Sequence, residues 1–226
     1  MAKEAKKVVK EGLSEYFMFT IEGTEDVANG WSKRMQALEA ESMPFEILYR
    51  MRTYQYGPRP VRFFVWRNDK QHTLGESPLP DGRVRLFREN SRGGLSYLGD
   101  QLLRYVPIKA PIEVNLGPDD LVVYASRKAR TERFNFSFHR ERVNGWDERQ
   151  SWMDTIQNYR TKPIVFELRR RWKGDVEYSA EGPAALADFQ TIEARFTLTP
   201  RSRHRYPATI VRHNGANQSQ SRILLR

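Results

Sequence analysis

Three phenylalanines alternate with polar residues in the segment Thr131–Arg140 (TERFNFSFHR). Phe134, Phe136 and Phe138 occupy every second position, and arginine, asparagine, serine and histidine lie between and beside them. Successive side chains of a β-strand point to opposite faces of the sheet, so this pattern is typical of a strand with one face on a core and one in water. The same pattern recurs along the chain, and no long segment with the 3.6-residue period of a helix competes with it. The sequence therefore predicts an all-β fold.

The length and the turn signals predict two units. A chain of 226 residues can bury a sizeable core, as one large β domain or two smaller ones. The best internal boundary is the turn Gly-Pro-Asp-Asp at 117–120. We expect a helical stub or a tail at 1–11, a first β unit at 12–118 and a second β-sandwich unit at 119–226. The predicted architecture is thus two packed β-sandwich-like units, the second with an immunoglobulin-like arrangement.

Strands are predicted where apolar residues alternate, or run continuously, between turn signals. Residues 31–41 suit a helix by composition but also alternate, and their strand-like neighbours favour a strand. Turns rich in glycine, proline or aspartate separate the strands, as at 57–60 and 78–82. The predicted strands lie at 15–22, 45–55, 61–68, 83–89, 95–105, 112–116, 121–130, 131–140, 164–172, 176–179, 190–199 and 206–212.

The core of the second unit is predicted from the apolar positions of its alternating strands. In the segment 190–199, for example, every second residue is apolar. Residues with this spacing share one face of a strand, and we expect that face to be buried. The predicted core is led by Phe134, Phe136, Phe138, Phe166, Leu168, Ile192, Phe196 and Leu198.

Several classes of function lack their sequence signals. The chain has no cysteine, which excludes disulfides, cysteine-based zinc clusters and thiol nucleophiles. It has no run of eighteen apolar residues, no G-x-S-x-G motif and no glycine-rich phosphate loop. We therefore expect no metal, no cofactor and no membrane span. The four histidines lack the spacing of metal ligands; they are His72, His139, His204 and His213.

Two pairs of adjacent carboxylates leave one enzymatic alternative open. They are Asp119–Asp120 and Asp147–Glu148. Paired carboxylates catalyse glycoside hydrolysis when they flank the scissile bond. Neighbours in sequence do not have that geometry, and aspartates in a turn commonly bind the backbone. A non-catalytic chain is therefore the main expectation, and a hydrolase that uses these four residues is the alternative.

Positive charge is concentrated in the second half of the chain. The net charge is +10; residues 119–226 hold 20 basic and 13 acidic residues, a net +7, and residues 1–118 hold 18 and 15, a net +3. Such a surface attracts nucleic acid or anionic polysaccharide, although interspersed surface charge and the protection of strand ends are the simpler interpretations. Tryptophans near basic residues can stack on a base or a sugar. The candidate binding residues are Arg169, Arg170, Arg171, Trp172, Lys173, Arg201, Arg203, Arg205 and Trp146.

A series of short motifs follows in a fixed order along the first half of the chain. They are EYFMFTI (15–21), GWSKRMQALEA (30–40), PFEILYR (44–50), PLPDGRVRLFRE (78–89) and LSYLGDQ (95–101). In this order they resemble the C-terminal domain of unknown function of the mucoidy-inhibitor-like (MuiA-like) proteins. The resemblance covers roughly residues 12–226, is strongest at 78–117 and is weaker beyond 120. Its moderately specific part is Leu-Pro-x-Gly-Arg-Val at 79–84.

The resemblance implies a sandwich-like domain of a larger bacterial protein. In the family a small β domain and a helical coiled-coil segment come first, so residues 1–11 would be the end of that helix. Family members are often exported, which implies an extracytoplasmic location in the cell envelope, although the Lys-rich start of the chain lacks the apolar stretch of a signal peptide. The family name refers to an effect on exopolysaccharide production. It has no established catalytic residues, and none is transferred.

Taken together, the sequence predicts a non-catalytic binding or scaffolding module of a larger protein. Its partner would be another protein or the rest of its own polypeptide. The alternative is recognition of an anionic polysaccharide or a nucleic acid by the basic second half. Basic runs at 169–173 and 201–205 that lie on one surface would favour this alternative.

Overall fold

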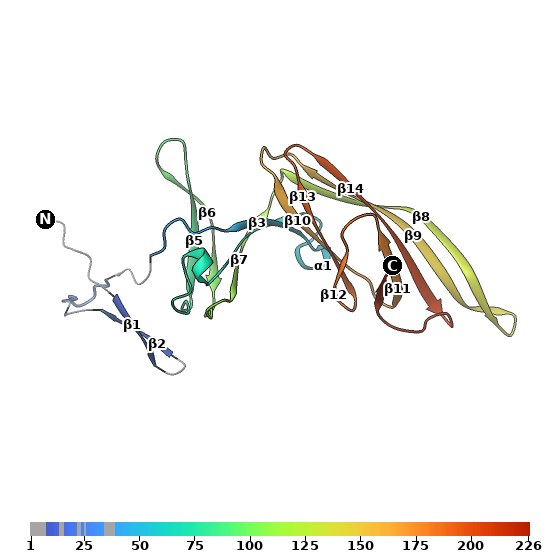
Figure 1. Ribbon diagram of the computed structural model, residues 1–226, viewed down its shortest axis with the longest axis horizontal. Coiled ribbons are helices and arrows are strands. Elements are labelled where there is room, and N and C mark those ends of the chain that lie inside the picture. Colours follow the sequence, from blue (N-terminus) through green and yellow to red (C-terminus); the bar gives the residue numbers. More distant parts are fainter. Residues whose placement is uncertain (1–7, 14–15, 22–23, 25, 34–38) are drawn as a thin grey trace. The chain divides into compact units, whose positions relative to one another are not determined.

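The computed structural model describes residues 8–13, 16–21, 24, 26–33 and 39–226 of the chain. It consists mainly of β-strands, which confirms the predicted all-β, sandwich-like fold (Figure 1). Among these residues, the only helical elements are the one-turn helix α1 (Thr53–Tyr56) and the 3-10 turn η1 (Lys70–His72). No helix of the described part is long and apolar enough to cross a membrane.

The chain divides into two compact units that differ from the predicted division at 118. The strands β3 (Glu46–Met51) and β4 (Val61–Arg67) precede that position, yet they lie in one sheet with β10 (Ile164–Arg171) and β13 (Thr191–Leu198). A turn in the sequence marks the end of a strand but does not tell which strands pair. The assignment of β3 and β4 to the same sheet as β10 could therefore not be predicted from the sequence. Unit 1 comprises residues 1–45, 66–84 and 102–112, and unit 2 comprises 46–65, 85–101 and 113–226.

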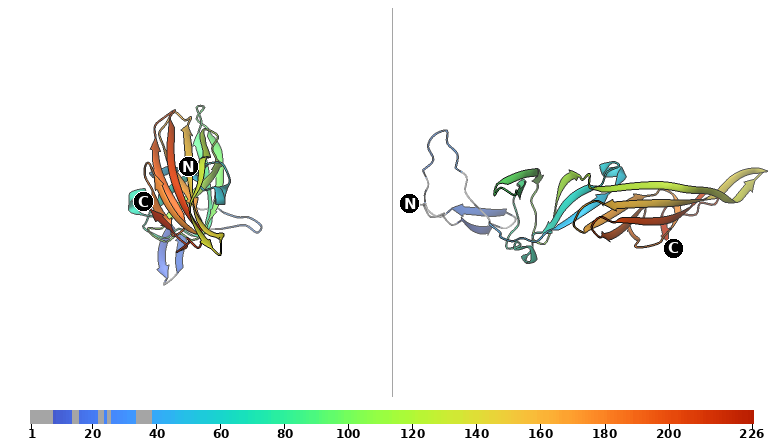
Figure 2. Two further views of the ribbon diagram at one scale, coloured as in Figure 1. Left: turned by 90° about the vertical axis from the view of Figure 1, so that its right-hand side faces the viewer. Right: turned by 90° about the horizontal axis from the view of Figure 1, so that it is seen from above.

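Unit 2 is built on two sheets that face each other across one core (Figure 2). The six-stranded sheet has the order β12-β13-β10-β3-β4-β7, in which β10 and β3 are parallel. The five-stranded sheet has the order β15-β11-β14-β9-β8, in which β11 and β15 are parallel. The predicted immunoglobulin-like arrangement was confined to residues 119–226. It therefore left out β3, β4 and β7, which complete the first sheet. The remaining strands are β7 (Pro111–Pro118), β8 (Val122–His139), β9 (Arg142–Asn158), β11 (Asp175–Ala180), β12 (Ala185–Asp188), β14 (Arg203–Gly215) and β15 (Ile223–Leu225).

The core between the two sheets contains most of the apolar residues that alternation predicted. Each large side chain buried here contributes about 1.5–3 kcal/mol relative to exposure. Tyr49 of β3, Ile156 of β9 and Tyr206 of β14 complete the same core from strands of both sheets. The confirmed members, all buried, are Phe166, Leu168, Ile192, Phe196 and Leu198.

The prediction that Phe136 and Phe138 lie in the core is wrong. Their side chains are 48% and 65% exposed, and Phe134 is only partly buried. These residues lie at the far end of the 18-residue strand β8, which with β9 forms a ribbon that continues beyond the other strands of the sheet (Figure 1). A bulge at Asn135, where φ is 52°, also interrupts the alternation. Alternation reports that two side chains share a face, not that anything covers that face.

Other local predictions have mixed outcomes. The hairpin of β5 (Gly82–Glu89) and β6 (Leu95–Leu103) is confirmed. The two strands predicted at 121–130 and 131–140 are the single strand β8, and the strand predicted at 45–55 ends at Met51.

The predictions for the first forty residues also differ in part from the structure. The helix predicted at 1–11 is wrong for residues 8–11, because they belong to β1 (Val8–Leu13), which pairs with β2 (Tyr16–Ile21). Residues 1–7 lie outside the described residues. The strand predicted at 31–41 is wrong at 31–33 and 39–41, and its remainder, 34–38, lies outside the described residues.

Candidate functional site

The two basic runs predicted from the sequence lie on opposite faces of the sandwich. Arg169 and Arg171 of β10 point away from the core on the outer side of the six-stranded sheet, since their neighbours Leu168 and Arg170 point inward. Arg203 and Arg205 of β14 point away from the core on the outer side of the five-stranded sheet, because Tyr206 is buried. The structure therefore does not bring the two runs together.

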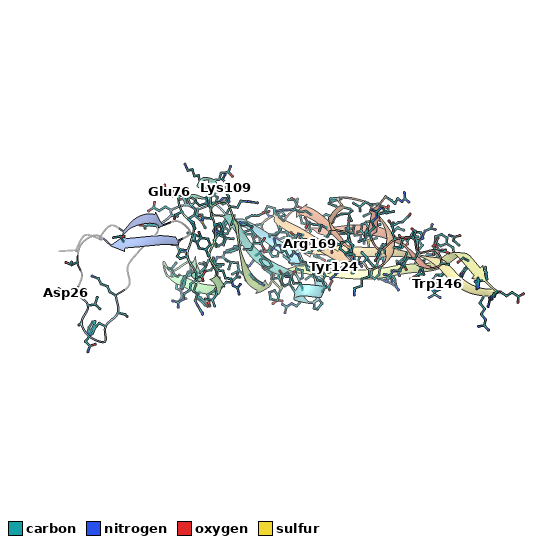
Figure 3. All side chains as sticks on the ribbon, turned by 90° about the horizontal axis from the view of Figure 1, so that it is seen from below. Asp26, Glu76, Lys109, Tyr124, Trp146 and Arg169 are labelled. Atoms are coloured by element: carbon teal, nitrogen blue, oxygen red, sulfur yellow. The ribbon has the colours of Figure 1, made fainter. Side chains whose placement is uncertain are left out.

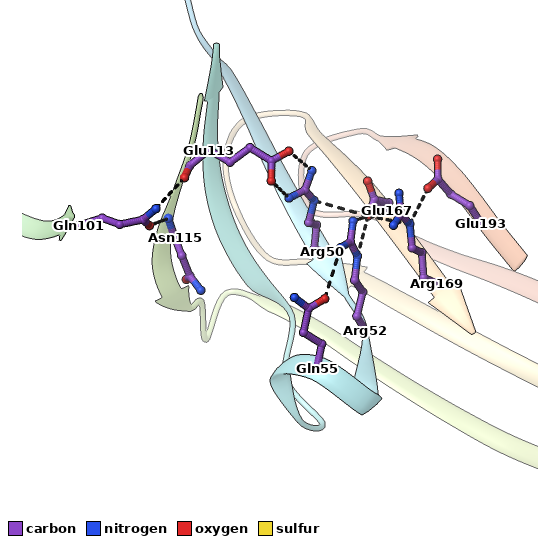
Figure 4. Close-up of polar contacts among 9 residues, drawn as sticks. All are labelled: Arg50, Arg52, Gln55, Gln101, Glu113, Asn115, Glu167, Arg169 and Glu193. Atoms are coloured by element: carbon purple, nitrogen blue, oxygen red, sulfur yellow. Dashed lines mark hydrogen bonds and ion pairs between the residues drawn. The ribbon is translucent and has the colours of Figure 1, made fainter. Parts of the chain in front are cut away.

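The outer side of the six-stranded sheet carries a network of ion pairs around one buried carboxylate (Figure 4). Glu167 lies 2.5 Å from Arg52 Nη2, 3.4 Å from Arg50 Nε and 3.5 Å from Arg169 Nε. Arg50 also binds Glu113 with both terminal nitrogens, and Arg169 binds Glu193 at 2.6 Å. The charges balance, so Arg169 is occupied within the protein and adds little to a binding surface.

Arg170 is an interior residue. Its Nη1 donates to both carboxylate oxygens of Asp154, at 3.0 and 3.2 Å. Its guanidinium carbon lies 4.4 Å from the ring centre of Trp152 and 4.9 Å from that of Trp172. The central arginine of the run therefore stabilises the sandwich.

The two candidate tryptophans already have arginine partners. Trp172 contacts Arg170, and the guanidinium carbon of Arg133 lies 5.5 Å from the ring centre of Trp146, which lies on the β8–β9 ribbon (Figure 3). Both rings are partly buried. Of the other candidates, Arg171, Lys173 and Arg201 are exposed, and Arg171 donates to Gln190.

A line of arginines crosses the outer side of the five-stranded sheet. The cross-strand register places Arg203 opposite Gln157, Arg205 opposite Thr155, and then Arg127, Arg130 and Arg149 on the next three rows of outward-facing positions. Rows of outward residues are two positions apart along a strand, or roughly 6.7 Å, so the five rows span roughly 27 Å. We call these five residues the arginine ladder.

The ladder is exposed and largely without internal carboxylate partners. In the described part of the chain, Arg127 and Arg205 form no side-chain hydrogen bond or ion pair, and Arg203 donates only to Gln157. Arg130 pairs with Glu132, and the guanidinium of Arg149 lies over the ring of Phe134.

The surroundings of the ladder contain few acidic groups. On the four rows from Gln157 to Ser151, the outward positions of β14, β9 and β8 hold no carboxylate, and the fifth row holds one, Glu132, opposite Arg149. These four rows therefore carry unbalanced positive charge on the outer side of the sheet. Sequence reasoning found only Arg203 and Arg205, because Arg127, Arg130 and Arg149 join them through a register between strands that a single sequence does not specify.

The four carboxylates of the hydrolase alternative are held in structural contacts. Asp119 accepts from Tyr49 and lies 2.7 Å from Arg160 Nη1, while Asp120 pairs with exposed Arg59. Burial opposes ionisation of Asp147, but hydrogen bonds from Asn135, His213 and Asn217 hold the pKa of that carboxyl below its usual range. Hydrogen bonds from Gln150 and Arg133 likewise lower the pKa of Glu148, against its partial burial. A general acid requires a raised pKa, so neither group suits that role.

Lowered carboxyl pKa values make the stability of unit 2 sensitive to acid. Burial opposes ionisation of Asp175, but hydrogen bonds from Ser219 and Gln220 lower its pKa. A depressed folded-state pKa stabilises the protein above the ordinary pKa, near 4, and this stabilisation is lost as the pH falls through the folded value. We therefore expect the free energy of unfolding to be nearly constant above about pH 5 and to fall below about pH 4.

Denaturant titrations at a series of pH values test this expectation with Asp175→Asn as the comparison. The variant should be less stable than the wild type at pH 7, and the gap should shrink as the pH falls below about 4 towards the lowered folded-state pKa, because protonation removes the advantage of the carboxylate over the amide. A gap that stays constant over this range would contradict the assignment.

Comparisons with protein-family models, with curated proteins and with solved structures find no significant match to this chain. The resemblance to the mucoidy-inhibitor-like proteins therefore stays a prediction.

Proposed function

We propose that this chain is a non-catalytic β-sandwich binding module and that the arginine ladder is its binding surface for an anionic polysaccharide. One observation supports the proposal above the others: five arginines from three neighbouring strands occupy five successive outward-facing rows, and two of them have no internal partner in the described residues. Cations on successive rows, roughly 6.7 Å apart along the strands, can meet successive carboxylate or sulfate groups of an extended polymer. The side chains beside them, such as Thr155 and Gln157, offer hydroxyl and amide groups for hydrogen bonds to sugars.

The wider setting is part of the same proposal. On the resemblance described above, the module would belong to a larger protein of the bacterial cell envelope, outside the cytoplasm. A partner protein, or another part of the same polypeptide, would then use the remaining surfaces of the sandwich.

The test is the binding of the whole chain to alginate, heparin, neutral dextran and single-stranded DNA over a range of salt concentrations. We expect saturable binding to the anionic polysaccharides and none to dextran. Arg127→Glu/Arg205→Glu should weaken binding by at least about tenfold and reduce the slope of log K against log salt by about one unit for each arginine. Both positions are exposed, so the variant should fold normally.

The matched control is Arg171→Glu/Lys173→Glu, which changes the net charge equally at exposed positions outside the ladder. It should retain most of the affinity. Equal losses in both double variants would mean that only the net charge matters, and the ladder proposal would be wrong. Binding of DNA in clear preference to both polysaccharides would assign the ladder to nucleic acid instead.

A further inference from the structure

A second surface, at the tip of the β8–β9 ribbon, is apolar. Phe136, Phe138 and Val143 are 48%, 65% and 49% exposed. Phe138 and Val143 are direct cross-strand partners, and Phe136 lies two positions earlier on the same strand. The strand β14 pairs with β9 only as far as Gly145, so beyond this point the ribbon is two-stranded (Figure 1). Phe138 and Val143 lie in this two-stranded part and Phe136 lies just before it, so three apolar side chains are exposed towards the end of a projecting hairpin.

The base of the ribbon is fixed to the rest of unit 2. Asp147 accepts from Asn135 on β8 and from Asn217 in the loop after β14, and it lies 2.8 Å from Nδ1 of His213. Asn217 also donates to the backbone oxygen of Asn135 at 2.7 Å. Contacts among these three segments hold the base of the ribbon in place. The apolar tip therefore projects from a fixed base.

The turn at the tip has an unusual composition. Its two central residues, Arg140 and Glu141, have φ angles of 47° and 68° and join the paired residues His139 and Arg142. Two-residue hairpin turns with both φ angles positive strongly favour glycine, which has no Cβ, and asparagine or aspartate, whose short polar side chains tolerate this region; most other residues are strained there. Charged residues are held at the tip in spite of this strain. Arg140 and Arg142 flank the apolar group, and Glu141 only partly offsets their charge.

We propose that the ribbon tip binds anionic lipid membranes by inserting Phe136, Phe138 and Val143 at the headgroup boundary. Apolar side chains such as phenylalanine insert at this boundary in interfacial segments, and basic residues beside them are attracted to anionic headgroups. A protein partner fits less well, because a stable protein interface buries about 800 Å² and about 20–30 residues on each side. A hairpin tip of this size offers far less, whereas a membrane needs only a few apolar side chains and nearby positive charge.

Co-sedimentation of the whole chain with phosphatidylcholine vesicles, with and without phosphatidylserine, tests the proposal. We expect binding only to the vesicles that contain phosphatidylserine. Phe136→Ser/Phe138→Ser should reduce the partition constant by at least about tenfold, because each change removes the favourable free energy of transferring an apolar side chain out of water. Arg140→Ser/Arg142→Ser should reduce it by roughly fivefold for each arginine. Phe189→Ser is the matched control, because Phe189 is equally exposed, at 63%, in the turn between β12 and β13, and this variant should bind as the wild type does.

The absence of cysteine allows a second measurement on one labelled site. A polarity-sensitive fluorophore at Val143→Cys should shift to shorter wavelength when phosphatidylserine vesicles are added, and the same label at Ser179→Cys, an exposed position of β11, should not. The proposal is overturned if the wild type does not bind these vesicles, or if Phe136→Ser/Phe138→Ser binds them as well as Phe189→Ser does. It is also overturned if the fluorescence of both labels changes alike. Loss of vesicle binding with the tip variants but not with the ladder variant separates this surface from the arginine ladder. Pull-down of a protein through the tip without vesicle binding would assign it to a protein partner instead.

Discussion

Replacing Asp154 with alanine is expected to lower the free energy of unfolding of unit 2 by about 3–5 kcal/mol. The Asp154 side chain is fully buried, at 0% exposure, and it accepts hydrogen bonds from Arg170 and from the hydroxyl of Tyr124, the latter at 3.0 Å. Burial, together with the charge of Asp154, raises the pKa of the Tyr124 phenol, so the phenol stays protonated and remains a donor.

The large effect arises from the group that the substitution leaves behind. Without Asp154, the guanidinium of Arg170 stays against the rings of Trp152 and Trp172 and has no counter-charge among the described residues. Two aromatic rings stabilise a cation, but they do not replace a carboxylate for a group that is only 12% exposed. The expected cost is therefore that of an isolated buried charge.

Denaturant unfolding of the whole chain measures this effect, and Asp120→Ala is the matched control. Asp120 also pairs with an arginine, Arg59, but both side chains are exposed, and an exposed pair contributes less than about 1 kcal/mol. If Asp154→Ala costs no more than Asp120→Ala, then Arg170 does not depend on Asp154 for its counter-charge.

The second large effect is expected for Glu167→Gln, at about 3 kcal/mol. The side chain of Glu167 is only 5% exposed and faces three arginines. Arg50 and Arg169 keep a second carboxylate, in Glu113 and Glu193. Arg52, at 11% exposure, keeps only a hydrogen bond to the side-chain oxygen of Gln55. Most of the cost should therefore come from Arg52.

A double-mutant cycle tests that assignment. Glu167→Gln/Arg52→Met should be more stable than the sum of the two single changes predicts, by about 1–3 kcal/mol, because it removes the stranded cation together with its partner. The corresponding cycle with Arg169→Met should show a smaller coupling, since Arg169 retains Glu193. Equal couplings in the two cycles would contradict the special position of Arg52.

Patterns within one strand predicted the interior of the sandwich well. The alternation in β13 and the apolar positions of β10 identified Ile192, Phe196, Phe166 and Leu168, because in these strands one face meets the opposite sheet along its whole length. The same pattern failed at Phe138, because β8 continues past the end of the other sheet. A period of two distinguishes the faces of a strand, but it carries no information about what covers them.

Relations between strands were not predictable from this single sequence. The three arginines at 169–171 look like one patch in the sequence, yet β10 directs Arg170 to a buried aspartate and Arg169 to a balanced network. The arginine ladder shows the reverse case. Arg127 and Arg205 are 78 positions apart in the sequence, and they lie on neighbouring rows only because β8 and β14 both pair with β9. Basic runs are therefore poor guides to a basic surface in a β protein.

The parallel pairing of β3 with β10 has a consequence for synthesis of the chain. Arg52 and its partner Glu167 are 115 residues apart, and at about 5–20 residues per second a ribosome needs roughly 6–23 s to make the intervening segment. During that time β3 and β4 have emerged, but the strand that separates β3 from β13 does not yet exist. Apolar residues such as Tyr49 and Met51 then lack the neighbours from β9, β10, β13 and β14 that cover them in the finished sandwich. The six-stranded sheet thus cannot be completed before the C-terminal half has been synthesised. Until then, the exposed apolar residues of β3 and β4 make the nascent chain prone to aggregation.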